Sequence, residues 1–257
     1  MTIKENLALA YLAGRGIEFG ALNNPLPVDE ALTNVTFADR LTRRQALEIF
    51  PELRGLTESI VEPDIIVDFN DLASLTSLAP QKFDFLIANH FIEHLVNPIQ
   101  FLEGCSEILP VGGILFLTVP DKDETFDRNR TLTTNSHLWR DYRRRESRIS
   151  RSHLRDFLRN KEAVDTPHPE VVKYFENNGI PISYYDGNRL PANPFKRKRL
   201  YDFHRQRSIH VHVWNRLSFD NFLSWVNEKL NLGFDVMCTH QPEDVVGEMI
   251  YVLRKQQ

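Results

Sequence analysis

The stretch HFIEH, residues 90–94, brings together three side chains that can transfer protons or bind a metal. His90, Glu93 and His94 are spaced i, i+3 and i+4, so a helix beginning near His90 would place all three on one face. An imidazole titrates near neutral pH, and two imidazoles with a carboxylate can hold a divalent cation. His90 is therefore a candidate base, and the three residues together are a candidate partial metal site.

Other polar residues close the short apolar runs of the chain, where parallel strands would turn toward a ligand. They are Glu18 and Gly20 in GIEFG, Asp39 after NVTFA, Asp68 in DIIVDF, Asn89 and His90 after FDFLIA, and Asp121 after GGILFLTVP. Asp39 follows the Gly20 turn by about 20 residues, where an acidic side chain can accept both hydroxyls of a ribose. The pattern predicts a nucleoside site at one edge of a sheet.

A basic stretch after Asp121 is a candidate for holding the second reactant. The sequence DKDETFDRNRTLTTNSHLWRDY places Arg128, Arg130, His137 and Arg140 where they could close over a bound cofactor. The planar fork of an arginine suits carboxylate or phosphate. We therefore take the three arginines and Asp121 as candidate substrate-binding residues.

The charge of the chain divides between two regions. Residues 121–220 contain 21 Lys and Arg against 14 Asp and Glu, a net charge of +7, which leaves −11 for the remainder of a chain whose total is −4. Within this region RRRESRISRSHLRDFLRNK predicts a basic helix, and FKRKRLYDFHRQR interleaves Tyr201 and Phe203 with cations. Two such runs beside one site favour an anionic acceptor or partner.

The apolar pattern supplies the scaffold for these residues. Five short apolar runs bounded by turn residues indicate buried strands of a parallel sheet, and RLTRRQALEIFPEL and NPIQFLEGCSEILP between them have helical spacing. The alternation stops after Pro120 and resumes with the helical FDNFLSWVNEKLNLG and two closing strands, FDVMCTH and GEMIYVLRK. This predicts an α/β, doubly wound Rossmann-like sheet, mostly parallel, with a large insertion between the fifth and sixth strands.

We divide the chain accordingly into a core at 1–122, a basic acceptor-binding insertion at 123–215, and a closing helix and two strands at 216–257. The chain has 257 residues, 42% of them hydrophobic, enough for a sizeable core. Cys105 and Cys238 lie far apart without zinc-type spacing, so reduced thiols are expected. We find no signal peptide and no run near the roughly 20 apolar residues of a membrane span, and expect a soluble, cytoplasmic protein of open oligomeric state.

Several of these segments together resemble a class I S-adenosylmethionine-dependent methyltransferase. They are GIEFGALNNPLP, VTFADR, PDIIVDFNDL and the segment from Phe83 to Lys122. The H-x-x-E-H element, followed by a helix, L-x-x-G-G and a strand ending V-P-D, is similar to members associated with surface polysaccharide synthesis. The resemblance covers most of residues 15–122 and, more loosely, the last 40 residues. It implies S-adenosylmethionine as the cofactor.

The resemblance also implies roles for the residues at the strand ends. Glu18 and Gly20 would line the methionine part, Asp39 would hold the ribose with Arg40 as a further cofactor contact, Asp68 and Phe69 would border the adenine, and Asn89 would face the sulfonium. Leu22 departs from the family pattern, because it stands where a second glycine is expected. S-adenosylmethionine has no pyrophosphate for glycine backbone to cradle, so this turn can still bind it.

The kind of acceptor follows from what the fourth strand leads into. Methyl transfer from a sulfonium is an in-line displacement that needs a base only for an acceptor such as a hydroxyl. No N-P-P-Y or D-P-P-Y element, the arrangement for amino groups of bases, follows this strand, which favours oxygen as the acceptor atom. We take His90, His94 and His137 as the candidate catalytic histidines.

The resemblance leaves a divalent metal as a less favoured alternative. An E-x-x-E-H element with a downstream histidine serves as a metal site in the small-RNA 2'-O-methyltransferases. Here His90 replaces the first Glu, and the downstream partner would be His210 or His212, which alternate onto one face of a predicted strand in SIHVHVW. Glu-His at this position also occurs in members that need no metal, where Glu93 would favour a helix N-terminus. His210 and His212 are then candidates for substrate binding.

Three functions remain compatible with these residues. The favoured one is O-methylation of a saccharide or sugar-containing anionic acceptor. An RNA-directed methyltransferase is supported by the basic insertion but disfavoured by a pI near 6.1 and the lack of a recognised RNA-binding module. The third is an inactive, methyltransferase-like interaction module in glycan assembly, for which Leu22 is the sequence support.

Overall fold

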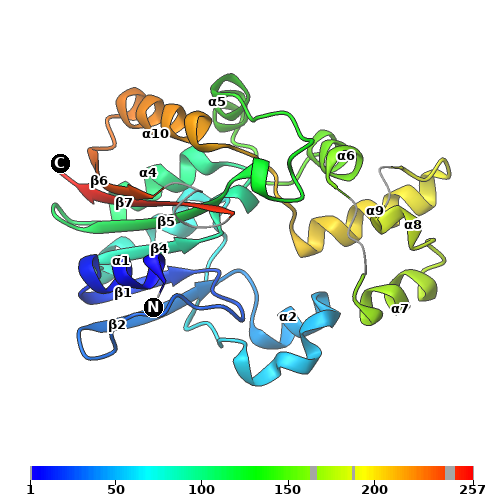
Figure 1. Ribbon diagram of the computed structural model, residues 1–257, viewed down its shortest axis with the longest axis horizontal. Coiled ribbons are helices and arrows are strands. Elements are labelled where there is room, and N and C mark those ends of the chain that lie inside the picture. The colour runs from blue at the N-terminus through cyan, green and yellow to red at the C-terminus, as the bar shows by residue number, and fades with distance from the viewer. Residues whose placement is uncertain (1, 163–166, 187–188, 241–246, 257) are drawn as a thin grey trace.

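The computed structural model describes residues 2–162, 167–186, 189–240 and 247–256 and centres on one seven-stranded sheet (Figure 1). The strands are β1 (Gly14–Phe19), β2 (Thr33–Asp39), β3 (Ile65–Ile66), β4 (Phe85–Asn89), β5 (Ile114–Pro120), β6 (Phe234–His240) and β7 (Glu248–Lys255). Their order is β3-β2-β1-β4-β5-β7-β6, and every neighbouring pair is parallel except the two that include β7. The predicted Rossmann-like, mostly parallel sheet is confirmed.

Helices connect the strands and cover both faces of the sheet. In the part of the chain before β5 they are α1 (Ile3–Tyr11), α2 (Arg43–Ile49), η1 (Pro51–Ser59), α3 (Leu72–Thr76), η2 (Ala79–Gln81), η3 (Ile92–His94) and α4 (Pro98–Ile108), and α10 (Arg216–Leu230) precedes β6. Side chains of β4 alternate between two apolar layers: Leu86 and Ala88 pack with α4 and α10, whereas Phe85 and Ile87 pack with α1. Burial on both faces accounts for the continuous apolar runs.

The order of the sheet reverses between β1 and β4. From β1 the chain proceeds to β2 and β3 on one side, and from β4 it proceeds to β5 on the other. Loops that leave two such strands diverge and open a crevice outside their carboxyl ends. The topology therefore fixes where a ligand site can form.

Residues 121–215, here called the helical segment, lie between β5 and α10. They contain η4 (Lys122–Glu124), α5 (Asn135–Arg144), α6 (Arg151–Asn160), α7 (Pro169–Asn177), α8 (Ser183–Asp186) and α9 (Pro194–Arg207). A separate apolar core that includes Leu154, Phe175 and Leu200 holds α6, α7 and α9 together. In Figure 1 the helices α6 to α9 stand beside the sheet, with α7 near α2, whereas α5 lies next to α10.

Three predicted elements differ from the observed ones. DIIVDF forms a strand of only two residues. The predicted basic helix is interrupted because Arg145 takes a left-handed conformation (φ 51°) after α5, and Ser150 caps the start of α6 by accepting from the amide of His153. SIHVHVW is not a strand: the amides of Val211 and His212 donate to the carbonyl of Glu93 instead of to a neighbouring strand. Among the described helices, none has the length and apolarity that crossing a membrane requires.

Candidate functional site

A cavity of about 750 Å³ lies at the carboxyl ends of β1, β2 and β4. Its lining comes from residues 20–24, 39–41, 68–70, 89–91, 94–96 and 147–149, with Phe50, Glu52, Leu53, Arg205, Arg207 and Ser208. The structure therefore brings together six of the predicted cofactor residues, namely Gly20, Asp39, Arg40, Asp68, Phe69 and Asn89, and places His90 and His94 beside them. The cavity is at the topological switch point, where an open α/β sheet binds its ligand.

The turn after β1 keeps a glycine-like backbone even where it lacks glycine. Gly20 has a φ of 67°, and a Cβ on it would lie 2.7 Å from Cδ2 of Phe91, so a side chain is excluded on both counts. Leu22 also takes a left-handed conformation, with a φ of 49°. A leucine held there costs roughly 1–2 kcal/mol. The turn thus has the shape of the family fingerprint at the expense of strain at Leu22.

Asp39 and Arg40 follow β2 on one wall of the cavity. The carboxylate of Asp39 accepts from the amide of Leu41 at 3.2 Å. Burial raises the pKa of Asp39, against the lowering effect of the Leu41 and Arg40 amides and the Arg40 charge. The Arg40 guanidinium donates to the carbonyl of Gln206 at 2.6 Å, so it ties this wall to the end of α9.

An aromatic floor adjoins this wall. Phe69 packs edge-on against Phe91, with ring centroids 4.7 Å apart, and against Phe19 at 5.5 Å. Asp68 stands next to it, and its carboxylate accepts from the amide of Asn70 at 3.0 Å. The cavity therefore offers an apolar surface bordered by a carboxylate, which suits a flat base with polar edges.

A polar network joins the end of β4 to both ends of the chain. Oδ1 of Asn89 accepts from Thr118 Oγ1 at 2.6 Å and from Lys4 Nζ at 3.3 Å. Lys4 also donates to Glu248 at 3.0 Å, and Glu248 lies 2.7 Å from Nε2 of His90. These contacts fix the side chains of Asn89 and His90 at the cavity.

His90 is held in place by its backbone and by this carboxylate. Its φ is 46° and η3 begins only at Ile92, so the predicted helix that would align it with Glu93 and His94 does not exist. Its side chain is 41% exposed, with Nδ1 at 3.9 Å from Glu93. Burial alone would lower the pKa of His90, but the hydrogen bond to Glu248 and the charges of Glu93 and Glu248 outweigh it, and the pKa is raised.

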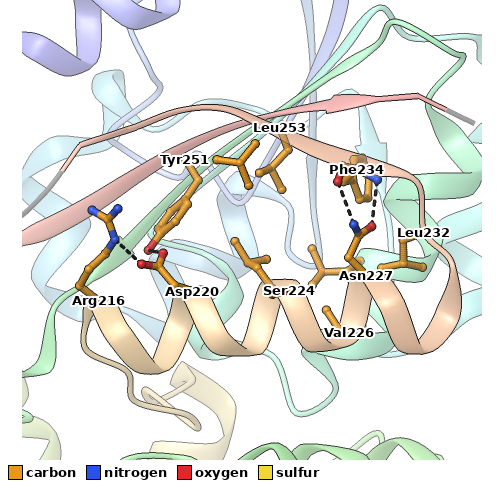
Figure 2. Close-up of a pocket in the computed structure, with 12 residues that line it drawn as sticks. Arg216, Asp220, Ser224, Val226, Asn227, Leu232, Phe234, Tyr251 and Leu253 are labelled. Atoms are coloured by element: carbon orange, nitrogen blue, oxygen red, sulfur yellow. Dashed lines mark hydrogen bonds and ion pairs between the residues drawn. The ribbon is translucent and has the colours of Figure 1, made fainter.

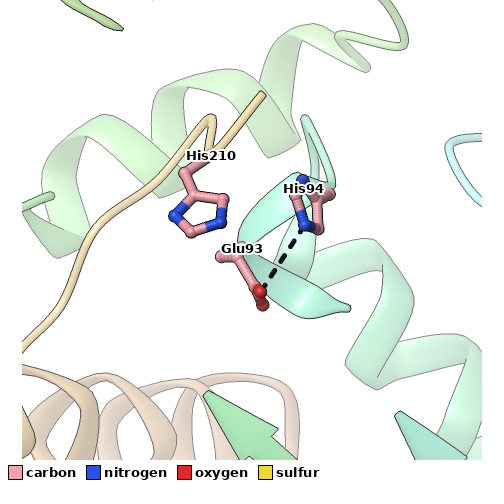
Figure 3. A group of neighbouring side chains, drawn as sticks. All are labelled: Glu93, His94 and His210. Atoms are coloured by element: carbon pink, nitrogen blue, oxygen red, sulfur yellow. Dashed lines mark ion pairs between the residues drawn. The ribbon is translucent and has the colours of Figure 1, made fainter. Parts of the chain in front are cut away.

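A second group of titratable residues, shown in Figure 3, combines Glu93 and His94 with His210. Within the described residues neither carboxylate oxygen of Glu93 receives a hydrogen bond, although Nε2 of His94 is 3.6 Å away. Nδ1 of His94 bonds the carbonyl of Ile209 at 3.0 Å, and Nδ1 of His210 bonds Asp127 at 2.5 Å. Among the described residues, the Nε2 of each histidine makes no hydrogen bond and lies on the side of Glu93, the orientation of metal-binding imidazoles.

This group corrects the predicted metal set. His210 takes the place of His90, because His90 is bound to Glu248. Burial and the nearby His210 lower the pKa of His94 to about 3, and burial raises the pKa of Glu93. The prediction that His210 and His212 share one face is also wrong, since His212 is buried with its Nε2 on the carbonyl of Val96.

Glu18 does not line the cavity. Its buried carboxylate accepts from the amide of Leu26 at 2.9 and 3.2 Å, and burial raises its pKa to about 8. Its contact with the methionine part of the cofactor stays a prediction. Glu18 instead anchors the chain that follows the β1 turn.

The predicted substrate residues of the helical segment also lie outside the cavity. The side chain of Arg130 is 1% exposed and pairs with Asp127 at 2.9 Å and with Asp156 at 2.8 Å. It also donates to the carbonyl of His210 at 2.7 Å. Arg130 is therefore an internal tie of the segment, with its donors engaged before any ligand arrives.

The other predicted residues of this segment also contact neighbours within the segment. Arg128 pairs with Glu162 at 3.3 Å, Arg140 contacts Asp141 at 3.5 Å, Asp121 is buried and caps η4, and His137 lies 3.0 Å from Asp141. Their position directly after β5 in the sequence did not show that these side chains pair within the segment. Burial raises the pKa of Asp121, as expected for an enclosed carboxyl.

Three arginines that the sequence motifs did not single out line the cavity. Arg207 bonds Glu52 at 2.9 Å, and Arg205 bonds Asp202 at 3.1 Å. Arg148 is exposed, and no acidic residue of the described chain pairs with it. Their presence in the two basic runs was the available signal, but only the helix break at Arg145 turns residues 147–149 toward the site.

A smaller cavity of about 350 Å³ lies between α10 and the strands β6 and β7 (Figure 2). Asp220 accepts from Arg216 and Tyr251, each at 2.7 Å, and Asn227 exchanges two hydrogen bonds with the backbone of Phe234. These bonds fasten α10 to the sheet. The cavity lies along the flank of the sheet and has no part in the site.

Comparison with known proteins gives a family and a set of distant structural matches. A family model described as a methyltransferase domain matches residues 15–162. No curated protein matches the chain.

Among solved structures, an S-adenosylmethionine-dependent methyltransferase from Clostridium acetobutylicum ATCC 824 is 8% identical, with 96% of this chain and 86% of that chain covered and a TM-score of 0.48. The CurJ carbon methyltransferase is 13% identical, with 96% and 50% covered and a TM-score of 0.44, so this chain spans half its length. The N-terminal domain of EvdMO1, solved with SAH and D-fucose, is 15% identical, with 95% and 77% covered and a TM-score of 0.38. The family model covers more than half of the chain, which therefore belongs to the methyltransferase-domain family and uses S-adenosylmethionine as its cofactor.

Proposed function

We propose that this chain transfers the methyl group of S-adenosylmethionine to a hydroxyl oxygen of a saccharide or other sugar-containing, anionic acceptor. The observation that carries the proposal is the pair formed by His90 and Glu248 at the cavity, 2.7 Å apart. A carboxylate that orients an imidazole is the usual way to prepare a base for a hydroxyl proton.

The proposed cofactor pose follows the lining of the cavity. Asp39, at the end of β2, accepts hydrogen bonds from the ribose hydroxyls. The adenine lies on Phe69, with Asp68 at its edge. Gly20 lines the cavity where the methionine part is placed, in a left-handed turn that packs against Phe91. Asn89 then faces the sulfonium from the end of β4, next to His90.

The proposed step is an in-line displacement. As the acceptor oxygen forms its bond to the methyl carbon, the bond from that carbon to sulfur breaks, and the sulfonium becomes a neutral thioether. Because Nε2 of His90 is engaged with Glu248, Nδ1 is the nitrogen that takes the hydroxyl proton. Because the pKa of His90 is raised, this nitrogen loses its proton at a higher pH than an ordinary imidazole does.

The acceptor is proposed to enter from the side of the helical segment, with residues 123–215 acting as an acceptor-binding insertion between the core pieces 1–122 and 216–257. Arg148 supports an anionic acceptor, because it is an exposed cation at the cavity with no acidic partner in the described chain. Its fork would bind a carboxylate or phosphate of the acceptor.

A second version of the reaction uses a divalent cation. Glu93, His94 and His210 fit one, since the carboxylate is buried without a hydrogen-bond donor from the described residues and both imidazoles present a free Nε2. Such a cation would bind acceptor hydroxyls and lower their pKa. In this version His90 would be relieved of the role of base.

The test begins with calorimetric titration of S-adenosylmethionine and its demethylated product, followed by methyl transfer to matched neutral and acidic saccharides. His90→Gln should lower kcat by roughly 100-fold or more with little change in cofactor affinity. His168→Gln, an exposed N-cap of α7, is the matched control. Activity that is lost on chelation and restored by a divalent cation would support the metal version.

Other outcomes would contradict the proposal. A chain that binds neither cofactor form would be an inactive interaction module. Equal turnover of neutral and acidic saccharides would exclude the anionic acceptor, and salt-dependent methylation of RNA would replace the saccharide with a nucleic acid.

A further inference from the structure

Three side chains from two helices of the helical segment converge at a point outside the cofactor cavity. His137 and Asp141 come from successive turns of α5, and His153 comes from α6. Nε2 of His137 lies 3.0 Å from Nε2 of His153 and 3.0 Å from Oδ2 of Asp141, and Nε2 of His153 lies 3.4 Å from the same oxygen. The two nitrogens share a hydrogen bond, in which one imidazole donates to the other, and with the carboxylate oxygen they form a small triangle.

The size of this triangle matches a cation's donor set. A zinc ion holds nitrogen and oxygen donors at about 2.0–2.1 Å, so two of its donors stand about 3.3 Å apart in tetrahedral geometry. The three edges here are 3.0, 3.0 and 3.4 Å. A cation seated over the triangle would reach all three donors without movement of either helix.

Within the described residues the two imidazole nitrogens are hydrogen-bonded to each other, but the carboxylate corner of the triangle is left unsatisfied. Asp141 is 5% exposed and His153 is 6% exposed. Oδ2 of Asp141 receives no hydrogen bond from the described residues, although both imidazole nitrogens lie within 3.4 Å of it. A buried carboxylate oxygen in this state is costly unless a cation completes it.

Aromatic rings enclose these three side chains and limit the access of bulk water to an ion bound there. The rings of His137 and His153 are stacked at an interplanar angle of 17°, and the buried ring of His212 stands edge-on to both. Only His137, with its side chain 31% exposed, opens the group to solvent.

We propose that His137, Asp141 and His153 bind one divalent transition metal ion of the zinc type, with the fourth position open to solvent beside His137. Two imidazoles and one carboxylate are ligands that such ions prefer over calcium or magnesium. This ion is separate from any cation at Glu93, since the two groups share no residue.

The ion has a structural consequence for the cofactor cavity. It joins α5 to α6 on either side of residues 145–150, and residues 147–149 within this connection line the cavity. Ser147 also lines a neighbouring cavity of about 890 Å³ together with Tyr142 and Arg143. The metal would therefore fix the distance between two helices and, through them, the position of Arg148.

The test uses the full chain, stripped with a chelator and titrated with Co²⁺ while visible absorption and heat are recorded. The wild-type chain should bind Co²⁺ with the absorption of a site containing imidazole and carboxylate, and Zn²⁺ should displace it. Asp141→Asn keeps the side-chain volume and should weaken binding by more than the roughly 100-fold that loss of an outer partner costs. His168→Gln, an exposed histidine outside both candidate groups, is the matched control and should leave Co²⁺ binding unchanged. Glu93→Gln removes a ligand of the other group and should leave the site at Asp141 in place.

A second readout does not depend on catalysis. Zn²⁺ should raise the Tm of the wild-type chain in a concentration-dependent manner and should not raise that of Asp141→Asn. If Asp141→Asn fails to fold, His137→Gln, on the partly exposed side, replaces it. The proposal is overturned if the stripped wild-type chain takes up no Co²⁺, or if uptake is lost in Glu93→Gln and kept in the Asp141 and His137 variants.

Discussion

The carboxyl edge of the sheet and the helical segment carry similar numbers of polar residues that the sequence marked as candidates, but their side chains are used differently. At the edge, Asp39 and Asn89 face one cavity. In the helical segment, Arg130 and His137 are engaged with acidic partners of the same segment. Residues marked by their sequence position therefore face the cavity at the sheet edge, whereas those in the helical segment pair with residues of the same segment.

The difference follows from how each region is organised. In a parallel sheet, the place where a strand ends is fixed by hydrogen-bond register, so residues distant in sequence meet at one edge regardless of their side chains. In a lobe of short helices, neighbours are decided by packing, and a charge near the core must be paired. Substitutions in the two regions should therefore have different consequences.

The largest effect is expected at Arg130, which is buried between Asp127 and Asp156. Arg130→Ala breaks a buried ion pair and leaves the buried carboxylate of Asp127 with His210 alone, which costs about 3–5 kcal/mol in the free energy of unfolding. Chemical denaturation should show this loss, whereas Arg128→Ala, whose ion pair is exposed, should cost less than about 1 kcal/mol. If the Arg130→Ala chain is stable and shows a selective defect in acceptor binding, Arg130 binds the acceptor as the sequence predicted.

At the sheet edge the expected effect is on the ligand and not on stability. Asp39→Ala should weaken S-adenosylmethionine binding by about 1.5–3 kcal/mol, the size of a hydrogen bond to a charged group. Calorimetry on this variant and on Asp29→Ala, in the loop before β2, separates the site from general effects of charge. Equal affinities in the two variants would remove Asp39 from the ribose position.

The pair of His90 and Glu248 should be visible in the pH dependence of turnover. The base must be unprotonated, so turnover rises as the pH passes upward through the raised pKa of His90. Glu248→Gln removes the carboxylate that raises this pKa, and the rising limb should move to lower pH. The exposed Glu58→Gln serves as the control. A limb that stays in place, or moves upward, would show that another group is titrating.

The smallest effect is expected at Leu22, where the edge departs from its family pattern. Leu22→Gly relieves about 1–2 kcal/mol of left-handed strain but adds backbone freedom worth roughly 0.5–1 kcal/mol to the unfolded chain. Stability should change by less than about 1 kcal/mol, and cofactor affinity should be kept. Leu22→Ala retains the strain and should be the less stable of the two by thermal denaturation. The reverse order would mean that the leucine side chain stabilises the turn by packing.

The fold and the cofactor-binding part of the site could be predicted from the sequence, because both depend on where the strands end. The runs that end at Gly20, Asp39 and Asn89 were recognisable by length and by the polar residue that closes each. The side chain that bonds His90 was not, because Glu248 follows it by 158 positions and reaches it only through the antiparallel pairing of β7 with β5. Arg148 was hidden in a basic run, where charge alone does not show which cation faces a ligand.

The contact between Lys4 and Glu248 joins positions 244 residues apart. A growing chain emerges from the ribosome with its N-terminal part first, so Asp39, Phe69 and Asn89 are available long before β7 exists. Until β7 inserts between β5 and β6, His90 lacks the hydrogen bond to Glu248 that orients its ring. We therefore expect the ability to bind the cofactor and the ability to transfer its methyl group to arise at different moments in the synthesis of the same molecule.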